Sequence, residues 1–396
     1  MMQISPETQL FIREHSSDDV RVLALQAKKY PDIDMPTAIT QIAGRKVAAE
    51  KIPSWWEIEK IWYPKHLSLE QCSSEITARY KARLLQGDSL TDLTGGFGID
   101  CSFLATGFKS ATYVERQEEL CEIAAHNFPV LNLNHINIKN EDGVTYLQAM
   151  SPVDCLFLDP ARRNEHGGKT VAISDCEPNV AELEELLLQK ANRVMIKLSP
   201  MLDLSLALKE LKQTQEVHIL SVNNECKELL ILLGQTSPAE ISIHCVNLFT
   251  KGTQKEQHFV FTREQEQCSE CTYTDSLETY LYEPNASLLK AGAFRSIAAA
   301  YPVRKLHPNS HLYTSDTFIE NFPGRIFRIV NQCSFNKKEV KENLTDLKKA
   351  NVTARNFPAT VAELRKRIHL AEGGDTYLFA STLNNGQKVL IRCEKV

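Results

Sequence analysis

The sequence lacks a long apolar run and a basic, apolar leader. Across its 396 residues, no stretch approaches the roughly 18 consecutive apolar residues that a membrane-spanning helix needs. The first residues, MMQISPETQLFIREHSSDD, carry acids where a signal peptide needs a basic start and an apolar core. We therefore expect a cytoplasmic protein with no membrane partner.

Paired cysteines are also scarce. Most of the 11 cysteines stand singly within apolar patterns such as VDCLFLD, as reduced core thiols do. Cys268 and Cys271 form the one close pair, and no second pair or His-x-His spacing accompanies it. The 11 histidines show no spacing typical of a catalytic dyad. The sequence thus predicts neither a disulfide framework nor a metal site.

Positive charge is in deficit overall but not locally. The net charge of −5 argues against a uniform polyanion binder. From Arg325 to the end there are 14 Lys/Arg against 7 Asp/Glu, a net of +7, which leaves −12 for the rest. A basic carboxy-terminal module on an acidic body is typical of a nucleic-acid-binding protein. Solvated helix faces such as ELRKRIHL are the alternative explanation.

Hydrophobic spacing divides the chain into parts. Residues 1–65 have helical spacing and predict an N-terminal helical domain. In residues 66–262, short apolar runs alternate with helical stretches, which predicts an α/β fold with a parallel, doubly wound sheet finished by antiparallel strands. The polar stretch TREQEQCSECTYTDS predicts a boundary. The rest predicts α+β structure in two small pieces, closed by a hairpin that turns with positive φ angles at residues 384–386.

A glycine-rich turn, DLTGGFGID, follows a predicted strand. Gly95, Gly96 and Gly98 let the backbone turn tightly and approach a ligand closely. Such a turn holds either a dinucleotide or S-adenosylmethionine, and the glycines alone do not decide between them. Asp92 favours S-adenosylmethionine, because a carboxylate attracts its cationic amino group and repels a pyrophosphate. A purely structural turn is the alternative.

Two further acids follow later strands. Glu115 closes the predicted strand ATYVE, where a carboxylate can accept both ribose hydroxyls of either cofactor. Asp142, followed by Gly143, comes after the next strand and can accept from an adenine amino group. Acids at strand ends are common, so the order of the strands carries this interpretation.

The segment VDCLFLDPARR favours methyl transfer over hydride transfer. Its strand ends in Asp159-Pro160, beside the first strand and across from the glycine turn. Proline removes a backbone donor, so the Asp159 side chain can point into the cleft as an acceptor. A methyl acceptor must be oriented and must lose a proton. Lys197 ends the next strand and either contacts a substrate phosphate or faces solvent.

These motifs, in this order and spacing, resemble those of class I S-adenosylmethionine-dependent methyltransferases with a Rossmann-like sheet. More narrowly, DPARR, DCEPNV, IKLSP, ECKELLILLG and YLYEPNASLLKAG resemble a bacterial group of such proteins with ferredoxin-like and THUMP-like domains at the carboxyl end. The resemblance implies a ferredoxin-like domain over residues 275–325 and a THUMP-like domain over 326–396. THUMP domains bind structured RNA, so it also implies an RNA partner, tRNA or rRNA.

The resemblance also implies site residues. The upstream segment EQCSSEITARYKARLL is similar to one that lines the methionine end of the cofactor. The implied cofactor-binding residues are Gln71, Ser74, Thr77, Asp92, Thr94, Gly95, Gly96, Gly98, Glu115, Asp142, Gly143 and Asp159. The implied catalytic residues are Asp159, Pro160 and Arg162, and the implied substrate-binding residues are Arg162, Arg163 and Lys197.

One departure from the family pattern affects the acceptor. Enzymes that methylate exocyclic base amines follow the acid with two prolines and an aromatic ring that stacks on the flipped base. Here Ala161, Arg162 and Arg163 stand in that place, and arginine can stack or pair with phosphate instead. This weighs against methylation of adenine or guanine amines. Methylation of pyrimidine carbon needs a cysteine nucleophile, and Cys155 lies inside a predicted buried strand.

The sequence therefore predicts an RNA methyltransferase acting on a nitrogen. Three alternatives stay open: a non-catalytic RNA-binding protein on a degenerate methyltransferase fold, a methyltransferase of another substrate, and a nucleotide-dependent oxidoreductase. The RNA, the methylated atom and the oligomeric state are not predicted.

Overall fold

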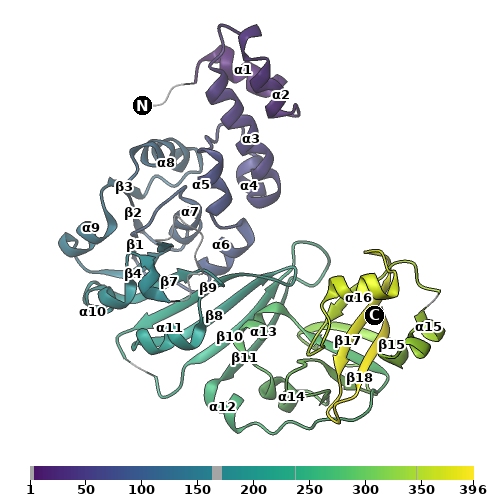
Figure 1. Ribbon diagram of the computed structural model, residues 1–396. Coiled ribbons are helices and arrows are strands. Elements are labelled where there is room, and N and C mark those ends of the chain that lie inside the picture. The colour runs from purple at the N-terminus through teal and green to yellow at the C-terminus, as the bar shows by residue number, and fades with distance from the viewer. Residues whose placement is uncertain (1–3, 163–171, 237, 345) are drawn as a thin grey trace. The chain divides into compact units, whose positions relative to one another are not determined.

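The computed structural model describes residues 4–162, 172–236, 238–344 and 346–396 (Figure 1). The chain divides into two compact units, one formed by residues 1–216 and 229–238 and the other by 217–228 and 239–396. Within the described ranges, no helix combines the length and the apolar surface needed to cross a bilayer.

The first unit begins with helices, as predicted. They are α1 (Pro6–Glu14), α2 (Val20–Leu25), the 3-10 turn η1 (Ala27–Lys29), α3 (Met35–Lys51), α4 (Pro53–Trp56), α5 (His66–Gln71) and α6 (Glu75–Ala82). Ser5, Asp19 and Asp34 cap three of them by accepting backbone N–H groups of the first turn. Trp55 packs edge-on against Phe97, so these helices share a core with the residues that follow.

A nine-stranded sheet, ordered β11-β10-β8-β9-β7-β4-β1-β2-β3, carries the candidate site. Its strands are β1 (Ser89–Asp92), β2 (Ser110–Glu115), β3 (Ile136–Asn140), β4 (Val153–Leu158), β7 (Ala191–Leu198), β8 (Thr214–Val222), β9 (Glu225–Gly234), β10 (Ser242–Leu248) and β11 (Glu256–Thr262). Strands β3, β2, β1, β4 and β7 are parallel. The β7–β9 and β10–β11 pairs are antiparallel, which confirms the predicted finish of the sheet.

Helices connect the parallel strands, as the α/β prediction requires. They are α7 (Ile99–Ala105), α8 (Glu118–Val130), α9 (Gly143–Ala149), α10 (Val180–Lys190) and α11 (Leu204–Glu210). A small antiparallel pair, β5 (Ala161–Arg162) and β6 (Cys176–Glu177), and the 3-10 turn η2 (Ile173–Asp175) follow β4. Strand order reverses between β1 and β4, and ligands of such sheets bind at that switch point.

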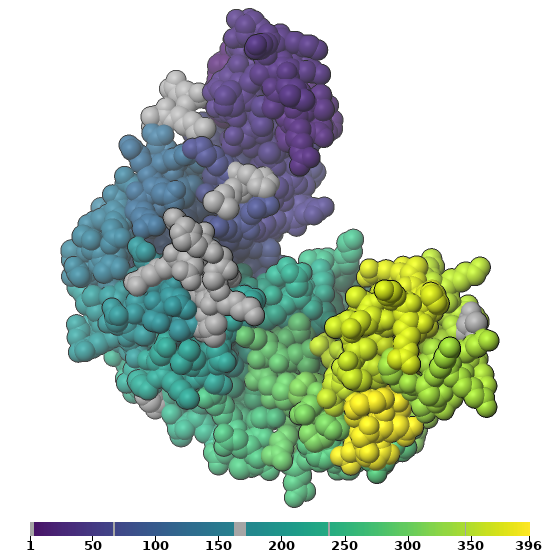
Figure 2. All heavy atoms as spheres, in the orientation of Figure 1, coloured from purple at the N-terminus to yellow at the C-terminus, as the bar shows by residue number. Residues whose placement is uncertain are grey.

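The second unit ends in a single seven-stranded sheet, ordered β13-β14-β12-β15-β18-β17-β16. Its elements are α12 (Arg263–Cys268), β12 (Tyr280–Pro284), α13 (Ala286–Ala291), α14 (Arg295–Ala300), β13 (Arg304–Lys305), β14 (Tyr313–Ser315), β15 (Gly324–Ser334), α15 (Lys337–Leu344), β16 (Asn351–Ala354), α16 (Val361–Ile368), β17 (Thr376–Thr382) and β18 (Lys388–Lys395). The two predicted α+β pieces thus share one sheet, because β12 pairs with β15. In the space-filling view the green residues of the first piece lie against the yellow-green and yellow residues of the second (Figure 2).

The polar stretch predicted as a domain boundary contains α12, which Thr262 and Gln265 cap reciprocally. One local prediction needs correction. In the closing hairpin only Gly386 has a positive φ, +85°, whereas Asn384 and Asn385 do not share it. Glycine alone therefore provides the left-handed turn conformation.

Candidate functional site

The glycine turn and Asp159 meet at the switch point of the large sheet. The Leu93 amide donates to the Phe157 carbonyl at 3.0 Å, which extends the pairing of β1 with β4. The Asp159 amide then donates to the Thr94 hydroxyl at 2.6 Å. The two motifs are therefore in direct contact, as their strand order predicts.

The three glycines of the turn have different physical roles. A Cβ on Gly95 would lie 2.2 Å from the Tyr113 ring, so this glycine permits close packing. Gly96 has φ +55°, and a Cβ there would meet nothing closer than the Thr94 carbonyl at 3.8 Å. Gly98 has φ +87° and precedes the first turn of α7. Only Gly96 faces open space of the kind that a ligand can fill.

Asp92 is fully buried, and half of its carboxyl group lacks a protein partner. Oδ1 accepts from the Thr94 amide at 3.0 Å, whereas no described residue hydrogen-bonds to Oδ2. Burial raises the pKa of Asp92 to about 8, and the nearby carboxylates of Asp100, Asp159 and Glu115 add to the shift. An unsatisfied buried oxygen is costly, and a bound cation would satisfy it.

Glu115 reaches back from the end of β2 to the turn. Its two oxygens accept from the amides of Gly96 and Gln117, each at 2.8 Å. The side chain is 8% exposed, so these two bonds fix the orientation of its carboxylate. A carboxylate oxygen can accept more than one bond, so further acceptor capacity is left beside Gly96.

Asp142 begins α9 and is exposed. Its Oδ1 accepts from the amides of Val144 and Thr145, at 3.1 and 3.0 Å. A Cβ on Gly143 would lie 2.2 Å from the Leu93 carbonyl, so this glycine is required by packing against the chain after β1. Close packing against Leu93 thus explains the glycine at this position, and cofactor binding by Gly143 stays a prediction.

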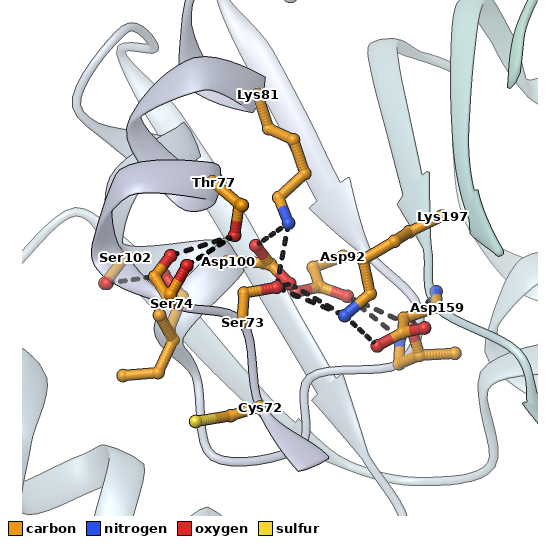
Figure 3. A network of polar contacts seen from close by, with 12 residues as sticks. Cys72, Ser73, Ser74, Thr77, Lys81, Asp92, Asp100, Ser102, Asp159 and Lys197 are labelled. Carbon is orange, nitrogen blue, oxygen red and sulfur yellow. Dashed lines mark hydrogen bonds and ion pairs between the residues drawn. The ribbon is translucent and has the colours of Figure 1, made fainter. Parts of the chain in front are cut away.

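A buried polar network lies next to Asp92 (Figure 3). At its centre the Ser73 hydroxyl donates to Asp100 at 2.7 Å and accepts from Lys81 at 2.8 Å and from Lys197 at 3.1 Å. Lys81 is completely buried and pairs with Asp100 at 2.9 Å. Lysine is rarely buried without a compensating charge, and Asp100 supplies that charge here.

The two lysines determine the charge state of Asp100. Burial alone would raise the pKa of this carboxyl group, but Lys81 and Lys197 outweigh burial and lower it below the usual value. Asp100 is therefore an anion between two cations. Neither Ser73, Lys81 nor Asp100 was predicted as a site residue, although Asp100 ends the quoted stretch DLTGGFGID.

Lys197 lies at the end of β7 and is 7% exposed. Its Nζ is 2.5 Å from Asp159 Oδ2 and 3.5 Å from Asp100 Oδ2. The solvent-facing alternative is therefore wrong. Surrounding protein atoms raise the pKa of Asp159 while Lys197 acts in the opposite direction. The Asp159 side chain retains 37% exposure, so a ligand can still reach it.

The residues predicted to line the methionine end of the cofactor, Gln71, Ser74 and Thr77, differ in exposure. Ser74 and Thr77 begin α6, with their hydroxyl oxygens 3.1 Å apart, and Thr77 is buried. Gln71 ends α5 and is exposed. The neighbouring Ser73, which the prediction passed over, connects this segment to Lys197.

The segment after Asp159 is described only in part. Pro160 is buried, and Ala161 and Arg162 form β5. The Arg162 side chain and the whole of Arg163 lie outside the described residues. Cys155 is 1% exposed within β4, and burial raises the pKa of its thiol to about 11, which does not suit a nucleophile.

Comparisons with known proteins agree with this architecture. A ferredoxin-like domain model matches residues 280–323, and a THUMP-like domain model matches residues 324–395. A solved structure from Porphyromonas gingivalis W83, named "putative methyltransferase", is 34% identical, covers 100% of both chains and has a TM-score of 0.87. The chain belongs to the same family. Its members combine a Rossmann-like methyltransferase fold with ferredoxin-like and THUMP-like domains, which confirms the resemblance given by the motifs.

Other solved structures match only part of this chain, at lower identity. An rRNA methylase from Streptococcus thermophilus is 15% identical over 40% of this chain and 93% of its own, with a TM-score of 0.30. A Streptococcus mutans protein, named "a putative methyltransferase" and solved in complex with SAH, is 13% identical over 40% of this chain and 96% of its own, also with a TM-score of 0.30. No curated protein matches the sequence.

Proposed function

We propose that this family member transfers a methyl group from S-adenosylmethionine to a nitrogen of tRNA or rRNA. The observation that carries the proposal is the unpartnered, buried Asp92 oxygen next to a glycine turn whose Gly96 opens into free space. A purely structural turn has no need for either feature. Both suit a cationic ligand that lies close to the backbone.

The residues at the switch point fit the parts of this cofactor. Asp92 would hold the amino group, Glu115 the ribose hydroxyls and Asp142 the adenine amine, in the order of strands β1, β2 and β3. Ser74 and Thr77 would line the methionine end together with Ser73. When bound, the cofactor supplies an electrophilic methyl group on a sulfonium centre.

Asp159 would orient the acceptor nitrogen. Its carboxylate is partly exposed at the end of β4, and Lys197 holds one of its oxygens. The other oxygen would accept an N–H bond from the acceptor and take its proton. Pro160 removes a competing backbone donor at the next position. Arg162 and Arg163 follow directly and are proposed to bind phosphate or to stack on a base.

The carboxy-terminal part supports an RNA substrate. Several basic side chains between residues 337 and 367 are exposed, namely Lys337, Lys338, Lys341, Lys348, Lys349, Lys366 and Arg367. They belong to the segment that matches the THUMP-like domain model. Exposed lysines and arginines attract polynucleotides through their phosphates, whatever the sequence of the bases.

Cofactor binding is the first test. Titration calorimetry on the purified full chain should show one equivalent of S-adenosylmethionine bound with micromolar-scale affinity, and Asp92→Ala should abolish this. Asp203→Asn is the matched control, because Asp203 caps α11 and asparagine caps equally well. Binding retained by Asp92→Ala would refute the site. A rise in melting temperature with a nicotinamide cofactor but not with S-adenosylmethionine would favour the oxidoreductase alternative.

Methyl transfer is the second test. RNA from a strain that lacks the protein should take up label from labelled cofactor, and mass spectrometry of the digested nucleosides should identify the methylated nitrogen. Asp159→Asn should bind cofactor but transfer at least 100-fold more slowly. Cofactor binding and RNA binding without any label uptake would favour the non-catalytic RNA-binding alternative.

A further inference from the structure

Three histidines that are far apart in the sequence lie together on adjacent strands of the large sheet. His218 is on β8, His244 on β10 and His258 on β11, and these strands are consecutive at one edge of the sheet (Figure 1). The cluster was not predicted, because intervals of 26 and 14 residues match no metal-binding motif. Only the strand order brings these residues together.

The contacts between the rings are close. Nδ1 of His244 lies 3.1 Å from Nε2 of His258. The rings of His218 and His244 stack with centroids 4.3 Å apart and an interplanar angle of 16°. Ring nitrogens of His218 and His244 lie within 4.8 Å of each other, and a carboxylate oxygen of Glu216, two residues earlier on β8, lies within the same distance.

The separation of His244 and His258 suits two ligands of one small metal ion, and His218 lies beside His244. Two nitrogens that bind tetrahedral zinc at about 2.0–2.1 Å are about 3.3 Å apart, close to the separation of His244 and His258. His218 is 2% exposed, whereas His258 is exposed on the edge strand. An ion could therefore enter beside His258, where a ring can turn about χ2 to direct its lone pair. Glu216 also pairs with Arg193 at 3.0 Å, so the imidazoles are the principal ligands.

We propose that His218, His244 and His258 bind one divalent transition-metal ion of the zinc class. Neutral imidazole nitrogens are preferred ligands of Zn²⁺, Ni²⁺ and Cu²⁺, and they bind Mg²⁺ and Ca²⁺ poorly. The ion connects β8, β10 and β11, so it stabilises the edge of the sheet. The site is separate from the proposed methyl-transfer residues, and either proposal can fail without the other.

Metal titration on the tag-free full chain tests this site. In competition with a chromophoric chelator, the wild-type protein should bind one equivalent of Zn²⁺. His244→Ala and His258→Ala should each weaken binding at least tenfold. His258 is exposed, so its variant keeps the proposal testable if the more buried variants fold poorly. His126→Ala is the matched control and should bind as the wild type does, because His126 stacks on Trp62 in a helix elsewhere.

Two further measurements identify the metal ligands and test whether the ion stabilises the fold. X-ray absorption of the zinc-loaded protein should show nitrogen ligands at about 2.0 Å. Zn²⁺ should raise the melting temperature of the wild type and of His126→Ala, but not that of His244→Ala. Absence of stoichiometric binding, or equal affinity in the wild type and both cluster variants, would overturn the proposal.

Discussion

Lys197 and Asp159 form an ion pair, 2.5 Å from nitrogen to oxygen, that joins the ends of β7 and β4. The same nitrogen lies 3.1 Å from the Ser73 hydroxyl and 3.5 Å from Asp100. Lys197 therefore connects the proposed acceptor-binding carboxylate to the network beside Asp92. We assign it a positioning role for Asp159 instead of the phosphate contact expected from the sequence.

Replacing Lys197 tests that positioning role. In Lys197→Met, Asp159 loses its cationic partner, so its pKa should rise and its carboxylate should be less firmly oriented. We expect kcat for methyl transfer to fall about 100-fold while KM for RNA changes little. Lys197→Arg should recover part of the loss. A raised KM at unchanged kcat would instead show that Lys197 contacts the RNA directly.

Lys81 should matter for stability. Lys81→Met leaves the buried Asp100 with only the more distant Lys197, and breaking a buried ion pair costs about 3–5 kcal/mol. Urea unfolding should show this loss. Lys109→Met is the matched control, because Lys109 pairs with Asp88 at 2.8 Å on the surface, with both side chains largely exposed. The control should change stability by less than about 1 kcal/mol. Equal losses in both variants would contradict the assignment.

Asp92 should make both stability and cofactor binding depend on pH. Its pKa of about 8 in the folded protein exceeds the value of 3.8 of a free side chain. The folded state therefore binds more protons between these values, and unliganded stability should fall as pH rises through this window, by at most about 1.4 kcal/mol per pH unit. Asp92→Asn should remove this slope, as measured by urea unfolding at several pH values.

The same ionisation should affect cofactor affinity in the opposite direction. A cationic amino group prefers the charged carboxylate, so affinity for S-adenosylmethionine should rise with pH between about 5 and 7, by up to about tenfold per unit. The Asp92→Asn variant should bind weakly with a flat profile. A flat profile in the wild type would mean that Asp92 does not meet the amino group.

The sequence predicts the sheet well because its signals are local. Alternating apolar runs and helical stretches, capped by residues such as Asp142, identify the parallel strands and their switch point. Asp92 and Glu115 could be identified as candidates because each ends a strand, and Gly96 because it lies in the glycine turn after β1. Lys81 and Ser73 could not, because their role depends on Lys197, which is 124 residues from Ser73 in the chain.

Spatial neighbours on different strands are harder still to predict. The sequence predicts a cofactor-binding role for Gly143 because it follows Asp142. The sequence could not predict that a Cβ at this position would clash with the Leu93 carbonyl, because that contact depends on packing. His218 and His244 similarly become neighbours only through the order β8-β10. Sequence spacing carries no information about a strand order of this kind.

Two adjacent glycines should respond differently to alanine. Gly96→Ala adds a methyl group in open space at a positive φ, which costs about 1 kcal/mol, but it should weaken cofactor binding at least tenfold. Gly95→Ala pushes against the buried Tyr113 ring and should cost more stability, about 1–3 kcal/mol. Urea unfolding and cofactor titration on both variants check this. Unimpaired cofactor binding by Gly96→Ala would place the ligand elsewhere.

The exposed lysines of α15 should contribute to RNA affinity through phosphate contacts. Charge reversal of Lys337 and Lys338 should weaken binding of tRNA to the full chain, and the loss should shrink as salt increases. Each phosphate contact removed should lower the slope of log affinity against log salt by about 0.7–0.9.

Reversal of Lys28 and Lys29, in the N-terminal η1, is the matched control and should leave affinity unchanged. Cofactor titration should be unaffected by the α15 reversal, because the proposed cofactor residues belong to the other unit. It should also be unaffected by the control reversal, because Lys28 and Lys29 are exposed and are not proposed cofactor residues. Equal effects of the two reversals would indicate a response to overall charge and would contradict an RNA surface on α15.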